Sequence, residues 1–385
     1  RIGIARALSL NPKFIVCDGM AEKIKNAAVV LAAALFIFVF FAWNLLKPAQ
    51  AESVSERRPL AQLPAADAEA VLSGDFMEDF ETYALDQFPL RDGFRAVKAC
   101  VSLYALGQGD NNGIYVQDGY AAKLDYPMDT ASIDYAAGRF QYVYDRYLAG
   151  RDSGVFFALI PDKNFFMAEE NGYPAIDYEA FAARVREKTP FAEFIDLAPA
   201  LELSDYYRTD THWRQEKITD VAQLLAERMG TSIPGEYTVQ CVEAPFYGVY
   251  SGQSALPLQP DTLCYLETPA LESCTVYDYE TGETIPVYAL EKAGGRDPYE
   301  LFLSGSKSLL TIENPRATTD RALILFRDSF GSSLAPLLVD GYAKITLVDI
   351  RYISPALLDR FIAFDDQDVL FLYSVSILNS SETIK

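Results

Sequence analysis

The chain has 385 residues, half of them apolar, which is long enough for one large domain or two ordinary ones with a sizeable core. It carries 33 basic and 54 acidic residues, a net charge of −21. This balance argues against a nucleic-acid surface and against unassisted adhesion to anionic lipid. There is one histidine and no C-x-x-C spacing among the five cysteines, so no zinc site can be assembled, and we expect neither a metal nor another cofactor.

The aromatic and cysteine residues favour structural roles. The 24 Tyr and 24 Phe would suit stacked walls in a carbohydrate cleft, but we favour an aromatic-rich core, the commoner use of these side chains. Cys264 and Cys274 are spaced so that a disulfide could bridge a hairpin. Five cysteines leave one unpaired, however, and buried free thiols are the state that we favour.

Residues 1–18, RIGIARALSLNPKFIVCD, resemble the part of ABC-transporter ATPases that ends in the Walker B strand, here residues 14–18. Gly19 stands where that family has a glutamate, and the chain contains no G-x-x-x-x-G-K-[ST] loop to hold nucleotide phosphates. A Walker B strand without this loop cannot bind Mg-ATP. We therefore interpret residues 1–19 as a remnant or a misread upstream start without function.

An apolar run, AAVVLAAALFIFVFFAWNLL, occupies residues 27–46 and is long enough to cross a bilayer as a helix. Lys23 and Lys25 precede it, which predicts a cytoplasmic N-terminus and an extracytoplasmic domain beyond the membrane. Residues 49–51, AQA, resemble a cleavage site, but the run exceeds the apolar core of a signal peptide. Residues 20–54 thus predict a lead-in, an uncleaved signal anchor and a linker; cleaved export is the second interpretation.

Two helical stretches follow, at about 66–84 and on to about 106, and then residues 113–124 alternate around an Asp-Gly pair that predicts a β-hairpin. Four runs are apolar on both faces and are separated by helical segments: 155–160, 322–326, 344–349 and 368–373. They predict an α/β fold with a parallel sheet covered on both sides, whose ligands bind beyond the carboxyl ends of the strands. Residues 235–316 interrupt this pattern, and we interpret them as a β-rich, substrate-facing insertion.

The chemistry that the chain offers is centred on its one histidine. His212 follows Asp210 by two positions, so a carboxylate lies beside the only imidazole available for general-base chemistry. Ser329 follows a buried strand and precedes a helical segment, 331–339, whose first N–H groups would face a negative charge forming at the serine. Asp210 could orient His212, and His212 could take the proton of Ser329.

Each signal alone has a plainer explanation. A serine after a strand is usually a helix N-cap, and a lone D-x-H pair is more often a surface pair or a polar packing contact. There is no G-x-S-x-G elbow, so the usual α/β-hydrolase arrangement is not supported. The coincidence of one histidine, a neighbouring acid and a strand-end serine favours the catalytic interpretation.

The segment YYRTDTHWRQEKITDVAQLLAERM (206–229) resembles the hallmark of the DHHW proteins. It also resembles the D-[TH]-H-W motif in the SGNH-hydrolase-like domain of alginate O-acetylation proteins. The likeness continues in the family's order through ERRPLAQLP (56–64), ALDQFPLRD (84–92), IPDK (160–163), ILFRDSFGSSLAPLL (324–338) and LVDIRYI (347–353). It implies an SGNH-hydrolase-like (flavodoxin-like) three-layer sandwich over residues 55–385, following the transmembrane helix.

By that resemblance Ser329 is the nucleophile, His212 the base and Asp210 the acid. The family implies an extracytoplasmic O-acetyltransferase or acetylesterase that acts on a cell-surface or exported polysaccharide through an acetyl-serine intermediate. A membrane-bound O-acyltransferase would supply the acetyl group. The alternative is a non-catalytic glycan-binding or polysaccharide-assembly protein with the same fold.

Four further residues are candidates for substrate binding: Trp213, Arg351, Tyr352 and Lys163. Each has a structural explanation as well, because Trp213 would suit the core and Arg351 could pair with Asp349. Asp328, which precedes the proposed nucleophile, is expected to fix the turn rather than to take part in chemistry.

Overall fold

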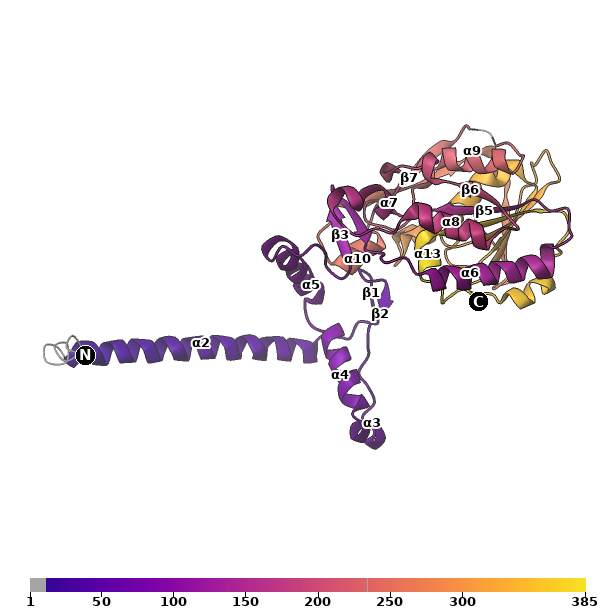
Figure 1. Ribbon diagram of the computed structural model, residues 1–385. Helices are drawn as coiled ribbons and strands as arrows, with labels where there is room; N and C mark the ends of the chain where they lie inside the picture. The colour runs from indigo at the N-terminus through magenta and orange to yellow at the C-terminus, as the bar shows by residue number, and fades with distance from the viewer. Residues whose placement is uncertain (1–11, 234) are drawn as a thin grey trace. The chain divides into compact units, whose positions relative to one another are not determined.

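The computed structural model describes residues 12–233 and 235–385, with side chains from residue 20 onward (Figure 1). The chain divides into two compact units. The smaller unit comprises the chain up to Ser53 together with Arg58–Arg95, and the larger unit comprises Val54–Arg57 and Ala96–Lys385. A short stretch of the linker thus belongs to the larger unit.

The smaller unit begins with the long helix α2, Pro12–Leu46 (Figure 1). Its portion Met20–Leu46 has a mean hydropathy of 2.6, and none of its most apolar stretch is buried. This portion is long and apolar enough to cross a membrane. The predicted span, 27–46, lies inside it. Residues 14–18, predicted as a Walker B strand, are helical instead, and residues 1–11 of that resemblance lie outside the described residues.

Three helices follow: α3 (Ala68–Ser73), α4 (Asp75–Asp86) and α5 (Arg91–Cys100). They confirm the two predicted helical stretches, with one break. Gly74 separates α3 from α4 at a φ of 95°, a conformation that glycine adopts without steric cost. Two-residue strands, β1 (Glu52–Ser53) and β2 (Arg58–Pro59), pair antiparallel on either side of Val54–Arg57.

The larger unit is built on an eight-stranded sheet. Its strands lie in the order β10 (Glu283–Ile285), β9 (Thr275–Asp278), β11 (Leu309–Glu313), β13 (Lys344–Val348), β12 (Ala322–Arg327), β14 (Asp368–Ser374), β5 (Val155–Ile160) and β6 (Glu193–Asp196). The five strands from β13 to β6 are parallel, as predicted. The other three strands pair antiparallel and come from residues 235–316. This region is therefore not only an insertion, because it extends the main sheet at one edge.

Helices cover both faces of this sheet (Figure 1). Along β5, Ala158 and Ile160 join a core with α9 (Thr219–Arg228) and the 3₁₀ segment Ala335–Gly341. Phe157 and Leu159 join the opposite core, with α6 (Thr130–Val143) and α8 (Tyr178–Lys188). The strand is apolar on both faces because both faces are buried, which confirms the three-layer sandwich.

Two hairpins flank the sheet. In β3 (Ile114–Gln117) and β4 (Tyr120–Lys123), Asp118 and Gly119 form the predicted turn, both with positive φ. The strands β7 (Thr238–Phe246) and β8 (Asp261–Glu267) place Cys241 opposite Cys264, and a disulfide joins them. The favoured assignment of free thiols is therefore wrong for Cys264, and its suggested partner Cys274 is free.

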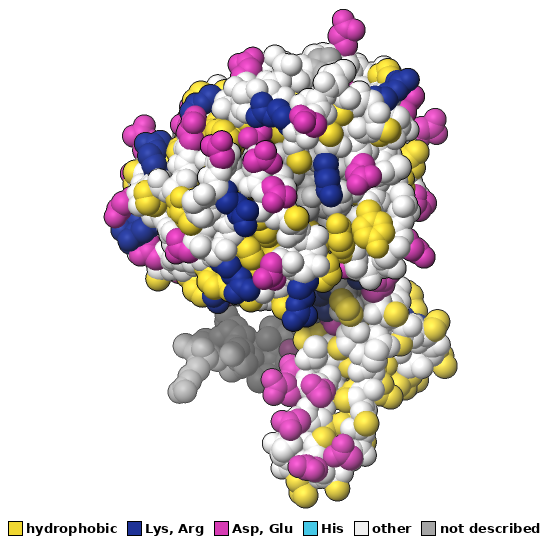
Figure 2. Space-filling view, turned by 90° about the vertical axis from the view of Figure 1, so that its right-hand side faces the viewer, with side chains coloured by type: hydrophobic (Ala, Val, Ile, Leu, Met, Phe, Trp, Pro, Cys, Tyr) yellow, Lys and Arg dark blue, Asp and Glu magenta, His cyan; other side chains and the backbone are white. Residues whose placement is uncertain are grey.

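The remaining elements of the described residues are short. Besides several 3₁₀ segments, they include two π-helical turns, Val101–Ala105 and Tyr144–Leu148, and the helices α7 (Lys163–Met167), α10 (Val249–Ser254), α11 (Pro269–Ser273), α12 (Gly331–Leu334) and α13 (Val375–Asn379). On the face of the larger unit that Figure 2 shows, basic side chains are scattered among acidic ones.

Candidate active site

Ser329 lies at the carboxyl end of β12, between that strand and α12. β12 is flanked by β13 and β14, so the serine leaves the middle of the parallel sheet at the edge where such folds bind ligands. Its side chain is half-buried.

The turn that carries Ser329 is fixed by its neighbour, Asp328. One carboxylate oxygen of Asp328 accepts a hydrogen bond from the N–H of Phe330 at 3.0 Å. The other accepts from the N–H and the hydroxyl of Ser374, at the end of β14, at 2.8 and 2.7 Å. Asp328 is fully buried, and it ties the serine turn to the adjacent strand, the role that the sequence predicts for it.

His212 meets Ser329 across 117 positions of sequence and connects it to Asp210. The Nε2 atom of His212 lies 2.7 Å from Ser329 Oγ, and its Nδ1 atom lies 2.6 Å from Asp210 Oδ1. Asp210 is fully buried and His212 is 8% exposed. The three side chains thus form one continuous hydrogen-bonded chain from carboxylate to imidazole to hydroxyl.

Asp210 is surrounded by groups that favour its charged form. Burial alone would raise the pKa of Asp210, but the hydrogen bond and charge of His212, the guanidinium of Arg57 and the N–H of Val249 outweigh it and hold the pKa below its ordinary value. The N–H of Val249, the first residue of α10, donates to Asp210 Oδ2 at 2.8 Å. Asp210 is therefore a carboxylate that can balance an imidazolium.

The loop that carries Asp210 and His212 is held by a buried lysine. Nζ of Lys163 donates to the carbonyls of Tyr207, Arg208 and Asp210 at 2.9, 3.3 and 2.8 Å. Only 2% of Lys163 is exposed, and burial lowers its pKa to about 7, against the opposing charges of Asp210, Asp261 and Asp162. Lys163 is suggested by the sequence as a substrate contact, but the structure places it beneath the loop as a support.

Aromatic side chains enclose the imidazole. The ring of Tyr299 stacks on His212, with centroids 3.8 Å apart and planes 8° apart, and its hydroxyl donates to Ser333 Oγ at 2.8 Å. Trp213 is fully buried, packs edge-on against Phe330 and donates from Nε1 to Ser333 Oγ at 2.8 Å. The structure places Trp213 in the core rather than at a substrate surface.

The N–H groups at the start of α12 are engaged within the turn. Phe330 donates to the Asp328 carboxylate, Gly331 donates to the Asp328 carbonyl at 3.1 Å, and Ser332 donates to the Ser329 carbonyl at 3.1 Å. The helix itself is only four residues long. The expectation that these N–H groups face a developing charge at Ser329 is therefore not met, because their hydrogen atoms point into the turn.

Arg351 and Tyr352 lie after β13, at the same edge of the sheet. Arg351 pairs with Asp349 through two contacts, of 2.9 and 2.7 Å, and only 12% of its side chain is exposed. Tyr352 is 49% exposed, with the Arg351 guanidinium over its ring. Arg351 thus adopts the ion pair considered as the alternative to substrate contact, and Tyr352 remains open to solvent.

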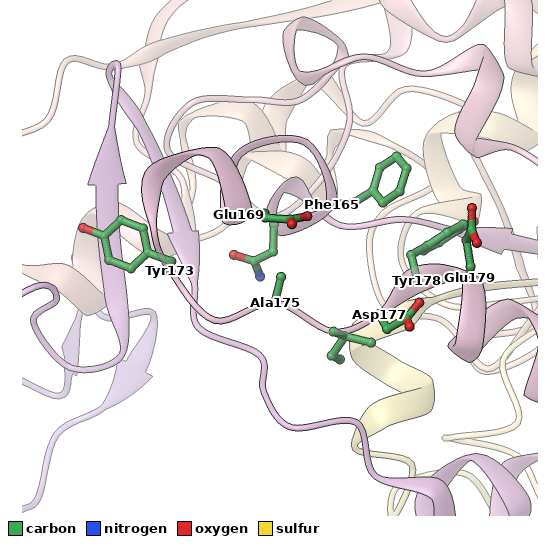
Figure 3. Close-up of a pocket in the computed structure, with 9 residues that line it drawn as sticks. Phe165, Glu169, Tyr173, Ala175, Asp177, Tyr178 and Glu179 are labelled. Atoms are coloured by element: carbon green, nitrogen blue, oxygen red, sulfur yellow. The ribbon is translucent and has the colours of Figure 1, made fainter.

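A cavity of about 420 Å³ lies beside α7 and the start of α8 (Figure 3). Its lining combines aromatic rings with carboxylates and includes Phe165, Glu169, Tyr173, Asp177, Tyr178 and Glu179. No triad residue lines this cavity. Within residues 20–233 and 235–385, no group of three or more His, Cys, Asp or Glu side chains is arranged to hold a metal ion.

Two residues of the site carry no signal in the sequence, and a third carries an incomplete one. Tyr299 and Val249 lie within the region 235–316, whose irregular pattern gives no reason to place them beside the histidine. Arg57 belongs to the quoted segment ERRPLAQLP, so a signal existed, but not one that indicated a partner.

With this geometry in place, solved structures supply the comparison. A DHHW family protein from Eubacterium siraeum superimposes with a TM-score of 0.58, at 22% identity over 71% of this chain and 95% of that one. Over that share of its length, the chain has the fold of a DHHW family protein. Bacillus cereus PatB1 with a sulfonyl adduct matches with a TM-score of 0.51, at 20% identity over 69% of this chain and 95% of that one.

The likeness to the O-acetyltransferase domain of Pseudomonas putida AlgJ is weaker, with a TM-score of 0.43 and 16% identity over 69% of this chain and 92% of that one. No protein-family model and no curated protein matches the sequence. The comparisons thus show a fold shared with the DHHW family protein and PatB1, while the chemistry is argued from the site.

Proposed function

We propose that the protein is an extracytoplasmic, membrane-anchored O-acetyltransferase or acetylesterase that acts on a cell-surface or exported polysaccharide. The observation that carries the proposal is the hydrogen-bonded chain Asp210–His212–Ser329, with contacts of 2.6 and 2.7 Å. These distances lie within the range that a nucleophile and its general base require. The apolar helix Met20–Leu46 supports the anchor.

In the proposed reaction, Ser329 Oγ attacks the carbonyl carbon of an acetyl ester while its proton moves to Nε2 of His212. Asp210 balances the charge of the resulting imidazolium. The tetrahedral intermediate collapses, the leaving alcohol takes the proton from His212, and acetyl-Ser329 remains. A polysaccharide hydroxyl, or water, then gives its proton to His212 and attacks the acetyl carbonyl. The bond between Ser329 Oγ and the acetyl group breaks, His212 returns the proton to Ser329 Oγ, and the acetylated sugar or acetic acid is released.

The acetyl donor in this proposal rests on the family resemblance. It implies that a membrane-bound O-acyltransferase supplies the acetyl groups. The acceptor is a glycan hydroxyl. Transfer and hydrolysis share the acetyl-Ser329 stage, and they differ in whether a sugar hydroxyl or water reaches it first.

The proposal is tested with the full-length protein in detergent or nanodiscs and p-nitrophenyl acetate as the donor. We expect release of p-nitrophenol by the wild type, and a loss of about 10³-fold or more in Ser329→Ala and in His212→Ala. Phenylmethylsulfonyl fluoride should block the wild type by modifying Ser329, a probe that the sulfonyl adduct of PatB1 recommends. Equal rates in the wild type and both variants would refute catalysis.

Adding a short oligosaccharide separates the two reactions. A transferase yields O-acetylated sugar in proportion to the p-nitrophenol released, whereas an esterase yields free acetate. The non-catalytic alternative predicts sugar binding without either product.

A further inference from the structure

Arg57 comes from the linker that follows the membrane-spanning candidate, eleven positions after its last residue, Leu46. It nevertheless belongs to the larger unit, and its side chain is only 11% exposed. Nη1 lies 2.8 Å from an oxygen of Asp297 and 3.5 Å from Asp210 Oδ2, while Nη2 donates to the Tyr247 carbonyl at 3.0 Å. One guanidinium therefore bridges two carboxylates, one of which belongs to the triad.

The backbone around Arg57 is shaped to deliver this side chain. Arg57 has a φ of 54°, in the left-handed region that residues with a Cβ rarely adopt, so surrounding contacts have to hold it there. One such contact is close packing of the linker on α10. A Cβ on Gly252 would come within 1.6 Å of the Ser55 carbonyl oxygen, so only glycine allows this approach.

The helix α10, against which the linker packs, also binds Asp210, the acid of the triad. The N–H groups of Gly248 and Val249, at the start of α10, donate to Thr209 Oγ1 and Asp210 Oδ2 at 2.8 Å each. A Cβ on Gly248 would lie 2.4 Å from atoms of Thr209 and Asp210. The linker, α10 and the acid loop are thus packed without free space between them.

Asp297, the second carboxylate that Arg57 contacts, is bonded to the residue whose ring stacks on His212. Asp297 also accepts from the N–H of Tyr299 at 3.2 Å and caps the 3₁₀ segment Pro298–Leu301. Tyr299 is the residue whose ring stacks on His212. Arg57 therefore connects the acid beneath the imidazole with the segment that carries the ring beside it.

We propose that Arg57 is a positioning residue for the triad, through which the membrane-proximal linker orients Asp210 and sets the charge that His212 experiences. The inference rests on the proposed function, since it assigns Arg57 a part in that reaction. A cation beside Asp210 partly neutralises the carboxylate that stabilises the imidazolium. Removing Arg57 leaves Asp210 and Asp297 without their shared counter-ion, so His212 would hold its proton to higher pH.

The charged and titratable groups around the pair include Arg57, Lys163, Tyr207, Tyr250, Asp297, Tyr299 and Asp328. Lys163 bonds to backbone carbonyls of the loop, and Asp328 bonds to Ser374 and Phe330, so neither replaces Arg57 at the outer oxygen of Asp210. The effect of removing Arg57 is therefore expected to reach His212.

The test follows His212 directly, because it is the only histidine in the chain and its imidazole signals in NMR need no assignment. The full-length protein is compared with Arg57→Ala, Arg57→Lys and Asp297→Asn. The matched control is Arg184→Ala on α8, which breaks a surface ion pair with Asp134 on α6. We expect the His212 titration midpoint to rise by about one pH unit in Arg57→Ala, to recover in part in Arg57→Lys, and to fall in Asp297→Asn.

Turnover of p-nitrophenyl acetate provides the second readout. In Arg57→Ala we expect kcat at pH 7 to fall about tenfold, KM to stay within about twofold, and the acid limb of the pH profile to move with the NMR midpoint. An unchanged midpoint in Arg57→Ala, or the same displacement in Asp297→Asn, would overturn the inference. If the midpoints move as expected but the wild type has no turnover, the charge coupling stands and the proposed function fails.

Discussion

Ser329 on one side of the triad, and Asp210 and His212 on the other, are held in place in different ways. The nucleophile side, which comprises β12, Ser329 and α12, is part of the central parallel sheet, and Asp328 ties it to the neighbouring strand. The base side, the loop 206–213, belongs to no strand of that sheet. It is held by contacts with residues far away in the sequence, from the linker to the region 235–316.

The difference indicates where the site is sensitive. A strand end in a buried sheet is fixed by many backbone hydrogen bonds, whereas a loop depends on the few side chains that satisfy its carbonyl and N–H groups. Substitutions that remove supports of the base side should therefore displace the imidazole while the sheet stays folded. Three such substitutions test this contrast, and a fourth, at the sheet edge, should leave the site unchanged.

Lys163→Met should have the largest effect. It keeps an apolar side chain of similar length but leaves three loop carbonyls without their charged donor, so we expect the free energy of unfolding to fall by about 4 kcal/mol. Activity should fall about a hundredfold even where the protein is folded, because the loop that carries Asp210 loosens. Denaturant unfolding and turnover measure both, with the exposed Lys344→Met as a control. Equal stability of the two variants would contradict the supporting role.

The Cys241–Cys264 disulfide acts on the same side. The hairpin that it closes provides Asp261, whose carboxylate accepts from the N–H groups of Arg208 and Thr209 at 2.9 and 2.8 Å. The two cysteines are 23 positions apart, and opening a loop of this length should cost about 3 kcal/mol of stability. Thermal unfolding of Cys241→Ala/Cys264→Ala measures the loss. Cys274→Ala, which removes a free thiol, should leave the melting temperature nearly unchanged.

Tyr299 offers a smaller and more specific effect. Tyr299→Leu removes the stacked ring and should lower kcat about threefold to tenfold, whereas Tyr299→Phe keeps the ring and loses only the hydrogen bond to Ser333. Steady-state kinetics of the two variants separate the contributions. A larger loss in Tyr299→Phe than in Tyr299→Leu would mean that the hydroxyl, not the stack, matters.

Arg351→Gln should have the smallest effect. Its guanidinium is committed to Asp349 and lies after a sheet strand, so we expect kcat and KM for p-nitrophenyl acetate and an oligosaccharide acceptor to stay within about twofold. An acceptor KM raised tenfold would instead restore Arg351 to the substrate-binding role that the sequence suggests.

The same contrast explains what the sequence could predict. The apolar runs at β5, β12, β13 and β14 define the parallel sheet because burial on both faces leaves a pattern in the residues themselves. Ser329 follows from that pattern, and His212 follows from being the only imidazole.

The supports of the base side leave no such pattern. Tyr299 stacks on His212, from which it is separated by 87 positions of sequence (299 − 212). Nothing in the sequence around either residue indicates this contact. The position of Lys163 after a strand suggests a substrate contact, and only the fold shows that its side chain lies under the loop and binds the loop's carbonyl groups. The pairing of Cys241 with Cys264 likewise depends on the hairpin register, which the irregular 235–316 region does not reveal.

The central claim is that Ser329 acts as a nucleophile activated by His212, and intact-mass analysis tests it most directly. The full-length protein is mixed with p-nitrophenyl acetate, quenched in acid within the first turnovers and digested to locate any added acetyl group. The account predicts one acetyl group on Ser329 in the wild type and none there in His212→Ala. An acetyl group on another residue, or equal labelling of Ser329 in both proteins, would contradict it.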